Sequence, residues 1–227
     1  MFEQLIFSGN LKKFVYTILC ASLCLLSACQ KHSDNQTQNT TKSEHATAIN
    51  TAHDSNTFIG IDISAEKIGA DFSLNSTLGK KISLKDTQGK IVVMLFGFTH
   101  CPDVCPTNLM TYSQALKMLK DKAENVQVYF VTVDPERDTP ELLGKYVPFF
   151  HPSFVGLIPE TQTELEKLAQ EWKITYKKVP LSRGNYTMDH SAGSYILDKT
   201  GKTVLYEAHG ISAYELAQDL ELLIDKK

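Results

Sequence analysis

The chain has 227 residues, 42% of them hydrophobic and 22% charged, which is typical of a globular protein and not of a collagenous or disulfide-stapled one. Its 23 basic and 26 acidic residues give a formal net charge of −3, so there is no electrostatic reason to expect nucleic acid as a partner. The five cysteines are an odd number and cannot form a closed set of internal disulfides, so their positions need separate explanations.

Residues 1–28 have the pattern of a lipoprotein signal peptide. Lys12 and Lys13 precede an uncharged run over residues 14–26, which has the length of a signal-peptide core and is shorter than the roughly 20 apolar residues of a membrane-spanning helix. The run ends in Leu-Ser-Ala-Cys, which resembles a bacterial lipobox, so we expect cleavage before Cys29 and lipidation of its thiol. An uncleaved membrane anchor is the alternative, and both interpretations place the remaining chain outside the cytoplasm, tethered to a membrane.

A polar segment follows over residues 29–57. It consists mainly of Ser, Thr, Asn, Gln, His and Lys, and it cannot bury enough apolar surface to offset the entropy of ordering it. We expect a flexible tether that lifts the following domain off the membrane. Cleavage of the signal peptide would remove Cys20 and Cys24, so that Cys101 and Cys105 remain as the free thiols of the mature chain.

From about residue 58 the sequence changes to the pattern of an α/β domain. Residues 72–74 and 81–84 lie on either side of a turn and predict a short hairpin. Continuous apolar runs at residues 91–98 and 126–133 are typical of strands that are buried on both faces.

Helices and further strands alternate through the rest of the chain. The helices are expected after the first apolar run as far as Leu119, from Asp138 to about Phe149, from Thr163 to Trp172, and after a capping box formed by Ser212 and Glu215. The strands are expected at residues 154–158, 174–179, 194–198 and 203–208. This order predicts one thioredoxin-like domain over residues 58–227: an α/β fold whose mixed central sheet is flanked by helices and carries extra hairpin strands at its N-terminal side.

Cys101 and Cys105 lie at the turn between the first apolar strand and the helix that follows it. Residues four apart share one face of a helix, so the two sulfurs can face the same point. The N-terminal end of a helix carries unpaired N–H groups and a partial positive charge, which stabilise a thiolate over a thiol. Such a dithiol can exchange electrons as a disulfide or bind a soft metal ion.

A third group bears on this choice. Redox thioredoxins commonly carry two residues between their cysteines, whereas this chain has three. Two thiolates alone prefer linear coordination of Cu(I), and an imidazole would complete a trigonal site. His190 lies in a loop that leads into the predicted strand at residues 194–198, and in a thioredoxin-like topology that loop lies beside the cysteine turn. We therefore expect His190 to be the third ligand.

Polar residues near these motifs receive mainly structural interpretations. His100 is expected to point away from the neighbouring sulfur, because successive side chains at the end of a strand alternate in direction. Asp103 is an acidic residue at a helix N-terminus, where the helix dipole favours it. Asp138 can cap the helix that follows it. Asp189 is a candidate to orient His190, as carboxylates do around metal-bound histidines.

Four segments together resemble the Sco/SenC family of copper-binding assembly factors for cytochrome c oxidase. They are residues 69–74, 96–106, 131–140 and 189–191, which occur in the family's order and span nearly all of the predicted domain. The match is specific because every motif position agrees, which a lone pair of cysteines would not provide.

The resemblance implies a thioredoxin-like fold with Cys101, Cys105 and His190 as ligands of copper, as Cu(I), with Cu(II) left open. It also implies that Cys101 and Cys105 can close a disulfide in the metal-free protein. The implied role is to deliver copper to the binuclear copper centre of an oxidase subunit, or to keep the cysteines of that centre reduced. A thiol reductant in the periplasm and other copper carriers are then further partners, and the lipid on Cys29 holds the domain at the membrane.

Two functions of different class follow from these residues. One is a copper chaperone, which binds and transfers its metal without turning over a substrate. The other is a thiol–disulfide oxidoreductase in which Cys101 and Cys105 are the redox-active catalytic pair and pass through a mixed disulfide. The three-residue spacer and His190 favour copper, because electron exchange alone needs no imidazole at that place.

Overall fold

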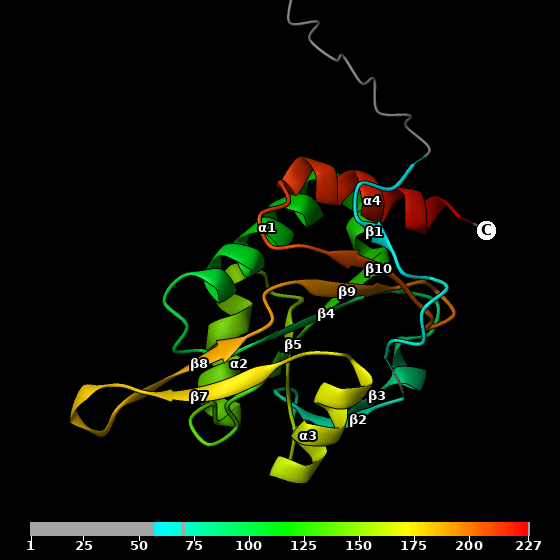
Figure 1. Cartoon of the computed structure of the whole chain (residues 1–227). Coiled ribbons are helices and arrows are strands. Elements are labelled where there is room, and N and C mark those ends of the chain that lie inside the picture. The colour runs from blue at the N-terminus through cyan, green and yellow to red at the C-terminus, as the bar shows by residue number, and fades with distance from the viewer. Residues whose placement is uncertain (1–56, 70, 227) are drawn as a thin grey trace, which may run out of the picture. The chain divides into compact units, whose positions relative to one another are not determined.

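The computed structural model describes residues 57–69 and 71–226 (Figure 1). The predicted signal peptide, the predicted lipidation site at Cys29 and nearly all of the predicted tether lie outside these residues. Among the helices that are described, none combines the length and the apolar character needed to cross a membrane.

The centre of the fold is an eight-stranded mixed sheet. Its strands are β1 (Ile61–Asp62), β2 (Ser73–Ser76), β3 (Lys81–Ser83), β4 (Ile91–Gly97), β5 (Val126–Thr132), β6 (Val155–Ile158), β9 (Ser194–Leu197) and β10 (Thr203–Glu207). They lie in the order β1-β10-β9-β4-β5-β6-β2-β3. Strands β4, β5 and β6 are parallel, whereas β9 runs antiparallel to β4 and β10 antiparallel to β9. The mixed sheet and the hairpin β2–β3 are as predicted.

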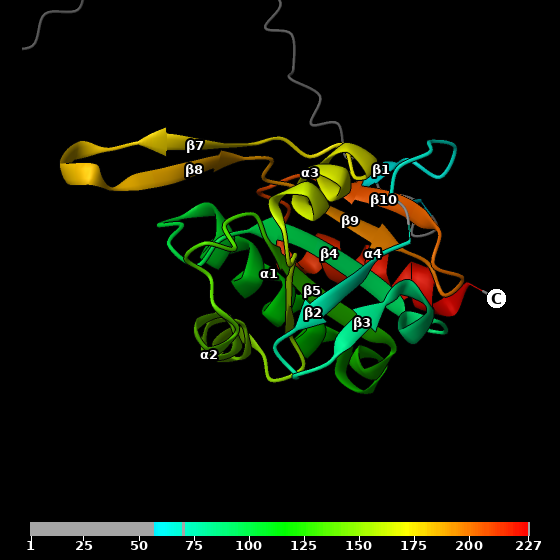
Figure 2. The ribbon, with the colours of Figure 1, turned by 90° about the horizontal axis from the view of Figure 1, so that it is seen from below.

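Helices cover both faces of this sheet. They are α1 (Val104–Leu119), α2 (Pro140–Phe150), α3 (Gln162–Glu171) and α4 (Ala213–Asp225), with short 3₁₀ turns at Leu84–Thr87, Lys120–Asn125 and Ser182–Gly184. Helices α1, α2 and α4 lie on one side of the sheet and α3 lies on the other (Figure 2). Every residue of β4 is therefore buried, which explains why its sequence is an unbroken apolar run and not an alternating one.

The helix starts follow the capping rules with one correction. The Ser212–Glu215 capping box opens α4 as predicted, and the side chains of Thr139 and Thr161 accept N–H groups at the starts of α2 and α3. Such caps stabilise a helix by about 1 kcal/mol each. The prediction that Asp138 caps α2 is wrong, because its carboxyl group is fully buried under the loop that carries the cysteines.

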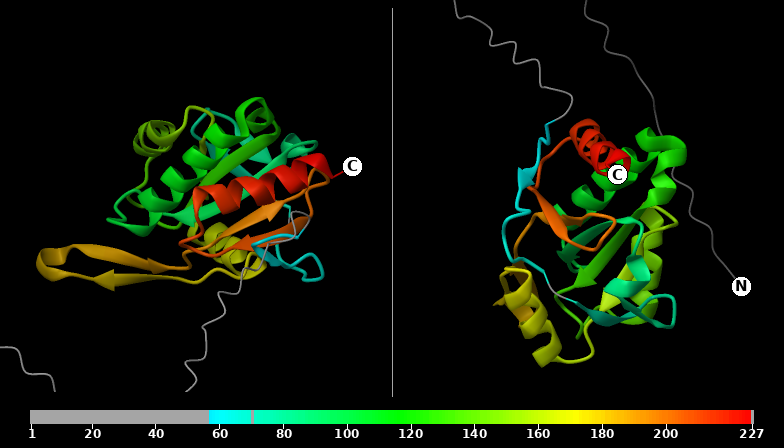
Figure 3. Two further views of the ribbon diagram at one scale, coloured as in Figure 1. Left: turned by 90° about the horizontal axis from the view of Figure 1, so that it is seen from above. Right: turned by 90° about the vertical axis from the view of Figure 1, so that its right-hand side faces the viewer.

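A two-stranded sheet extends away from the main one. It is formed by β7 (Tyr176–Pro180) and β8 (Tyr186–His190), and in two views the hairpin projects beyond the end of the main sheet (Figures 2 and 3). His190 was predicted to lie in a loop, but it ends β8 and pairs with Tyr176. The sequence did not indicate β8 because only one of its residues, Met188, is buried, and the strand lacks the apolar pattern that marks a strand packed on a core.

Two buried acidic residues lie near the N-terminal end of the described domain, and one of them, Asp219, holds it in place. Asp219 of α4 accepts the backbone N–H groups of Ile59 and Gly60 at 2.9 and 2.7 Å. Beside it lies Glu207 at the end of β10, whose carboxyl oxygens are buried without a hydrogen-bond donor among the described residues. Burial, and next the charge of Asp219, raise the pKa of Glu207 to about 8.

We expect Glu207→Gln to stabilise the protein at pH 8. The ordinary pKa of a glutamate is 4.5, so between that value and about 8 the native state holds a proton that the unfolded state has lost. The stability of the wild type therefore falls as the pH rises through this window, whereas the amide of the variant carries no such cost. Urea unfolding midpoints should be higher in the variant at pH 8 and nearly equal at pH 5. An equal rise of the midpoint at pH 5 and at pH 8 would contradict the raised pKa of Glu207.

Candidate metal centre

The two cysteines are placed by the junction between β4 and α1. After β4 ends, the backbone N–H of Cys101 donates to the carbonyl of Phe98 at 3.2 Å, which folds the chain back toward the sheet. Helix α1 then begins, with Cys105 in its first turn and with the N–H of Cys105 3.5 Å from the sulfur of Cys101. Cys105 is buried and Cys101 is half-buried, and no disulfide joins them. The junction thus leaves one thiol accessible and one enclosed.

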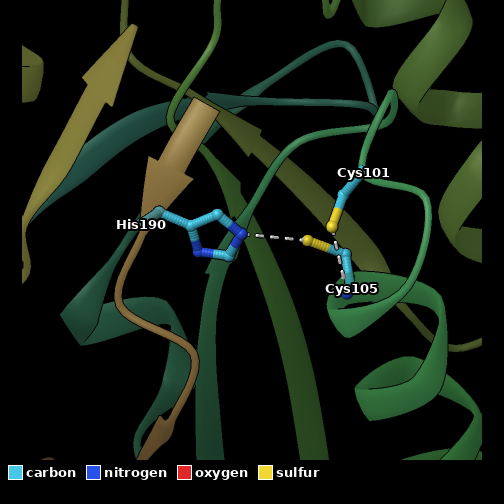
Figure 4. Close-up of side chains that lie close together, drawn as sticks. All are labelled: Cys101, Cys105 and His190. Carbon is cyan, nitrogen blue, oxygen red and sulfur yellow. Dashed lines mark hydrogen bonds between the residues drawn. The ribbon is translucent and has the colours of Figure 1, made fainter. Parts of the chain in front are cut away.

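The predicted third residue, His190, reaches the same point from the end of β8. Its Nε2 lies 3.4 Å from the sulfur of Cys105, and its ring points at that sulfur in the close-up (Figure 4). Its Nδ1 donates a hydrogen bond to the carbonyl of Ser191 at 2.8 Å. This bond places the ring proton on Nδ1, so Nε2 is left with the lone pair that a metal ligand needs.

The three side chains form a group that could hold a metal ion. One ligand atom from each of Cys101, Cys105 and His190 lies within 4.8 Å of the others, and no other group of three such residues occurs in the described part of the chain. Two sulfurs and one imidazole nitrogen are soft donors, which suit Cu(I) or Zn²⁺ and not the oxygen-seeking Mg²⁺ or Ca²⁺. The donor set therefore fits a soft, thiophilic ion.

The two thiols differ strongly in acidity. A hydrogen bond from the Cys105 side chain, followed by backbone N–H groups at the start of α1, lowers the pKa of Cys101 to about 4 although burial opposes it. Donating that bond, together with its own burial, raises the pKa of Cys105. At neutral pH the metal-free dithiol is thus a thiolate on Cys101 and a thiol on Cys105.

We expect iodoacetamide to alkylate Cys101 of the reduced protein at pH 6 nearly as fast as at pH 8. Its thiolate persists to about pH 4, whereas an ordinary thiol with a pKa of about 8.5 would be almost entirely protonated at pH 6. Mass spectrometry of the modified peptide locates the adduct. In Cys105→Ala, which lacks the donor, the rate at pH 6 should fall. Faster modification of Cys105 than of Cys101 would contradict the asymmetry.

The close approach of α1 to β4 depends on Gly97, the last residue of β4. A Cβ atom at this position would lie 2.5 Å from the sulfur of Cys105 and 2.8 Å from the ring of Phe130. Real Cβ contacts are not that short, so any larger side chain would push Cys105 away from the sheet. Glycine is therefore required for the observed position of this ligand.

A buried carboxyl group holds the loop before the cysteines. Asp138 accepts the N–H and the hydroxyl of Thr99 at 3.0 and 2.6 Å, and it accepts the hydroxyl of Thr132 at 2.6 Å. These bonds tie the loop to the end of β5, next to the parallel strand from which the loop departs. Sequence reasoning missed this role, because an acidic residue before Thr-Pro is also the usual start of a helix.

The other residues near the motifs lie outside the group of ligand atoms. The Nδ1 of His100 is 3.1 Å from the hydroxyl of Thr99, and His100 is not among the residues whose ligand atoms converge. Asp103 occupies the N-cap position of α1, although its side chain accepts no capping bond. Asp189 does not orient His190. The carbonyl of Ser191 does so, and a backbone acceptor gives no pattern in the sequence.

An arginine connects the hairpin to the site. The guanidinium of Arg137 pairs with the buried carboxylate of Asp134, donates to the carbonyl of Tyr186 at 2.9 Å and lies 3.6 Å above the ring of Tyr186. The hydroxyl of Tyr186 donates to Asp134 at 2.9 Å. Phe98 packs edge-on against His190 with ring centres 5.7 Å apart. Strand β8 is thus held at its first residue, Tyr186, and at its last residue, His190. These contacts restrict the movement of the strand that carries His190.

The fold and the site define a class of protein: a thioredoxin-like α/β domain with a dithiol at the start of a helix and an imidazole facing it. Comparison with known proteins identifies the family, because the family model SCO1/SenC matches residues 62–225. The chain belongs to this family. The prediction made from the motif segments is confirmed.

Relatives of this chain include both sequences and solved structures. The SCO2-like protein of Rickettsia prowazekii is 34% identical over 154 residues, which is 67% of this chain and 75% of that protein. The structure of Bradyrhizobium japonicum ScoI with copper bound is 38% identical, with a TM-score of 0.64, and the match covers 69% of this chain and 99% of that one. For Arabidopsis thaliana ScoI with copper bound the identity is 31%, the TM-score 0.65 and the coverage 70% and 99%.

Proposed function

We propose that this protein is a copper-binding assembly protein for cytochrome c oxidase, and that Cys101, Cys105 and His190 hold its copper. The observation that carries the proposal is the convergence of the three ligand atoms within 4.8 Å. Membership of the SCO1/SenC family supports it, as do the copper-bound structures of relatives that are similar in sequence and fold. Copper is the cargo of this protein, and its acceptor is the copper-bearing subunit of the oxidase.

The geometry suits transfer as well as binding. Cu(I) held by two thiolates and one imidazole has three ligands and keeps an open side, so a thiolate of the acceptor can attack it and displace the ligands one at a time. Cys101 is the half-buried member of the pair and Cys105 the buried one. We therefore expect the acceptor to approach from the Cys101 side, with Cys105 the last sulfur to release the ion.

The first test is a titration of the reduced protein with Cu(I) in the presence of a competing chelator. The wild type should bind one equivalent, and Cys101→Ser and Cys105→Ser should abolish stoichiometric binding. His190→Ala should weaken binding by roughly 100-fold or more, because even residues that only support metal ligands contribute about 10- to 100-fold. Equal affinity of the wild type and His190→Ala would remove His190 from the ligand set.

A thiol–disulfide oxidoreductase is the second candidate, and one observation favours it. The half-buried Cys101 has a pKa lowered to about 4 and sits next to a buried thiol, as an attacking cysteine and its resolving partner do. In that reaction the Cys101 thiolate attacks a partner disulfide and releases the first partner thiolate. Cys105 then loses its proton and attacks the sulfur of Cys101 in the mixed disulfide, which releases the second partner thiolate. Cys101 and Cys105 end as a disulfide, so a reductant outside the cytoplasm must restore them. This activity would survive in His190→Ala, whereas tight copper binding would not.

We also propose that the domain works outside the cytoplasm of a bacterium, attached to the membrane of the cell envelope. The support is the sequence of residues 1–28, which has the pattern of a signal peptide ending before Cys29, and the polar composition of residues 29–57. Residues 58–227 would then form the copper-binding domain, facing the periplasm. Such a location requires a periplasmic thiol reductant as a partner, because thiols are oxidised there.

We expect Cys29→Ser to abolish lipidation of the protein. The wild type should be recovered in the membrane fraction and should lose its first 28 residues and gain a diacylglycerol, which intact-mass spectrometry detects. The variant has no thiol to alkylate, so it should keep its signal sequence or appear without lipid. If the wild type and the variant differ in mass only by the substituted sulfur and oxygen atoms, the wild type carries no lipid on Cys29, and the proposal is contradicted.

A further inference from the structure

We propose that Asn108 is a positioning residue for the copper ligand His190. It acts through the chain segment that joins β8 to β9, and it works together with Tyr112 on the same helix. The inference rests on the proposed function, since it concerns one of the three proposed ligands, but the contacts on which it depends are present in the metal-free protein.

Three contacts between α1 and the segment after β8 form a regular series. The sulfur of Cys105 lies 3.4 Å from Nε2 of His190. The side-chain amide of Asn108 donates to the carbonyl of Ala192 at 2.7 Å. The third contact joins the hydroxyls of Tyr112 and Ser194 at 2.5 Å.

The series reflects the periodicity of both partners. On α1 the residues are spaced by three and then four positions, so they share one face of the helix. On the opposite side every second residue takes part, from the end of β8 to the first residue of β9. One face of α1 therefore sets the position of this segment along the helix, and with it the position at which His190 meets Cys105.

The contact of Asn108 acts on the ligand through one short path. Asn108 holds the carbonyl of Ala192, and the peptide bond that precedes this residue carries the carbonyl of Ser191. That second carbonyl accepts the Nδ1 proton of His190 at 2.8 Å. A shift of Ala192 would therefore move the acceptor that keeps the ring proton on Nδ1 and directs Nε2 toward the sulfur of Cys105.

The segment between β8 and β9 is held in place by contacts with neighbouring parts of the chain. Residues 191–193 belong to no helix or strand, and they include Gly193, whose backbone is intrinsically free. Ser191 is held from the other side, where its N–H donates to the carbonyl of Thr175 at 3.0 Å and its hydroxyl accepts from the N–H of Thr175 at 2.9 Å. Asn108 supplies the matching restraint on the side of α1.

A neighbouring histidine orients the amide of Asn108. The Nδ1 of His209, in the turn after β10, lies 2.7 Å from Oδ1 of Asn108 and donates to it. The carbonyl end of the amide faces His209, so its NH₂ end faces Ala192. Asn108 is only half-buried, so water can replace its bonds when the side chain is removed, and the domain is expected to fold without it.

The test uses the full chain, reduced and metal-free, with its histidines labelled with ¹⁵N. In the wild type the ring of His190 should give NMR signals of a single tautomer with the proton on Nδ1. In Asn108→Ala the same ring should show exchange between tautomers. Gln114→Ala, which removes an amide side chain at an exposed position of the same helix, is the matched control and should leave the spectrum of His190 unchanged. Unchanged tautomer signals in Asn108→Ala would overturn the inference.

Copper affinity provides the second measurement. Asn108→Ala should weaken Cu(I) binding by about 10-fold in the wild-type background. It should have no effect in the His190→Ala background, because the side chain acts only through that ligand. An equal loss in both backgrounds would assign Asn108 a general structural role and refute the positioning role.

The two measurements separate the inference from the proposed function. A wild-type chain that binds no Cu(I) would refute copper binding, while the tautomer of His190 would still decide whether Asn108 positions the ring. Tyr112→Phe removes only the hydroxyl of the third contact. It is expected to change the spectrum of His190 in the same direction as Asn108→Ala, but less, because its contact lies further from the ring.

Discussion

The contact between the sulfur of Cys105 and Nε2 of His190 is the constraint on which the rest of the site depends. It joins two residues 85 positions apart, so neither a turn nor a helix can create it locally. The fold creates it by bringing α1 close to β4, which is possible because Gly97 has no side chain. Strand β8 ends at the same point and places His190 there. The half-buried Cys101 then completes the group from the loop that connects the strand to the helix.

The site combines a rigid frame with one accessible sulfur. Asp138 binds the loop before the cysteines, and Arg137 holds the first residue of β8, Tyr186, next to the turn of the hairpin that carries His190. Cys105 is buried, whereas Cys101 is open enough to meet a partner. Both proposed functions need this combination, because copper transfer and disulfide exchange each begin with the approach of a foreign thiolate to a fixed sulfur. The imidazole is the feature that copper uses and electron exchange does not.

Much of this arrangement could be predicted from local patterns. The apolar run of β4, the cysteines at the start of α1 and the capping box of α4 are each recognisable within a few residues, and the structure has them where the sequence predicted. The predictions that were wrong concerned residues with two plausible local roles. Asp138 has the sequence context of a helix cap but is buried under the cysteine loop, and His190 was predicted to lie in a loop although it ends a strand.

The sequence by itself determined the chemistry: two thiols with three residues between them, a distant histidine, and a family resemblance carried by four segments in order. Only the tertiary structure decided the geometry. It assigned the partner of Nδ1 to the Ser191 carbonyl and not to Asp189, and it aligned one face of α1 with the segment after β8. The physical reason differs for the two contacts: the acceptor of Nδ1 is a backbone carbonyl, which every residue has, and the contact of α1 joins Asn108 to Ala192, 84 positions away. Their positions depend on how the whole sheet is assembled, and no local pattern records that.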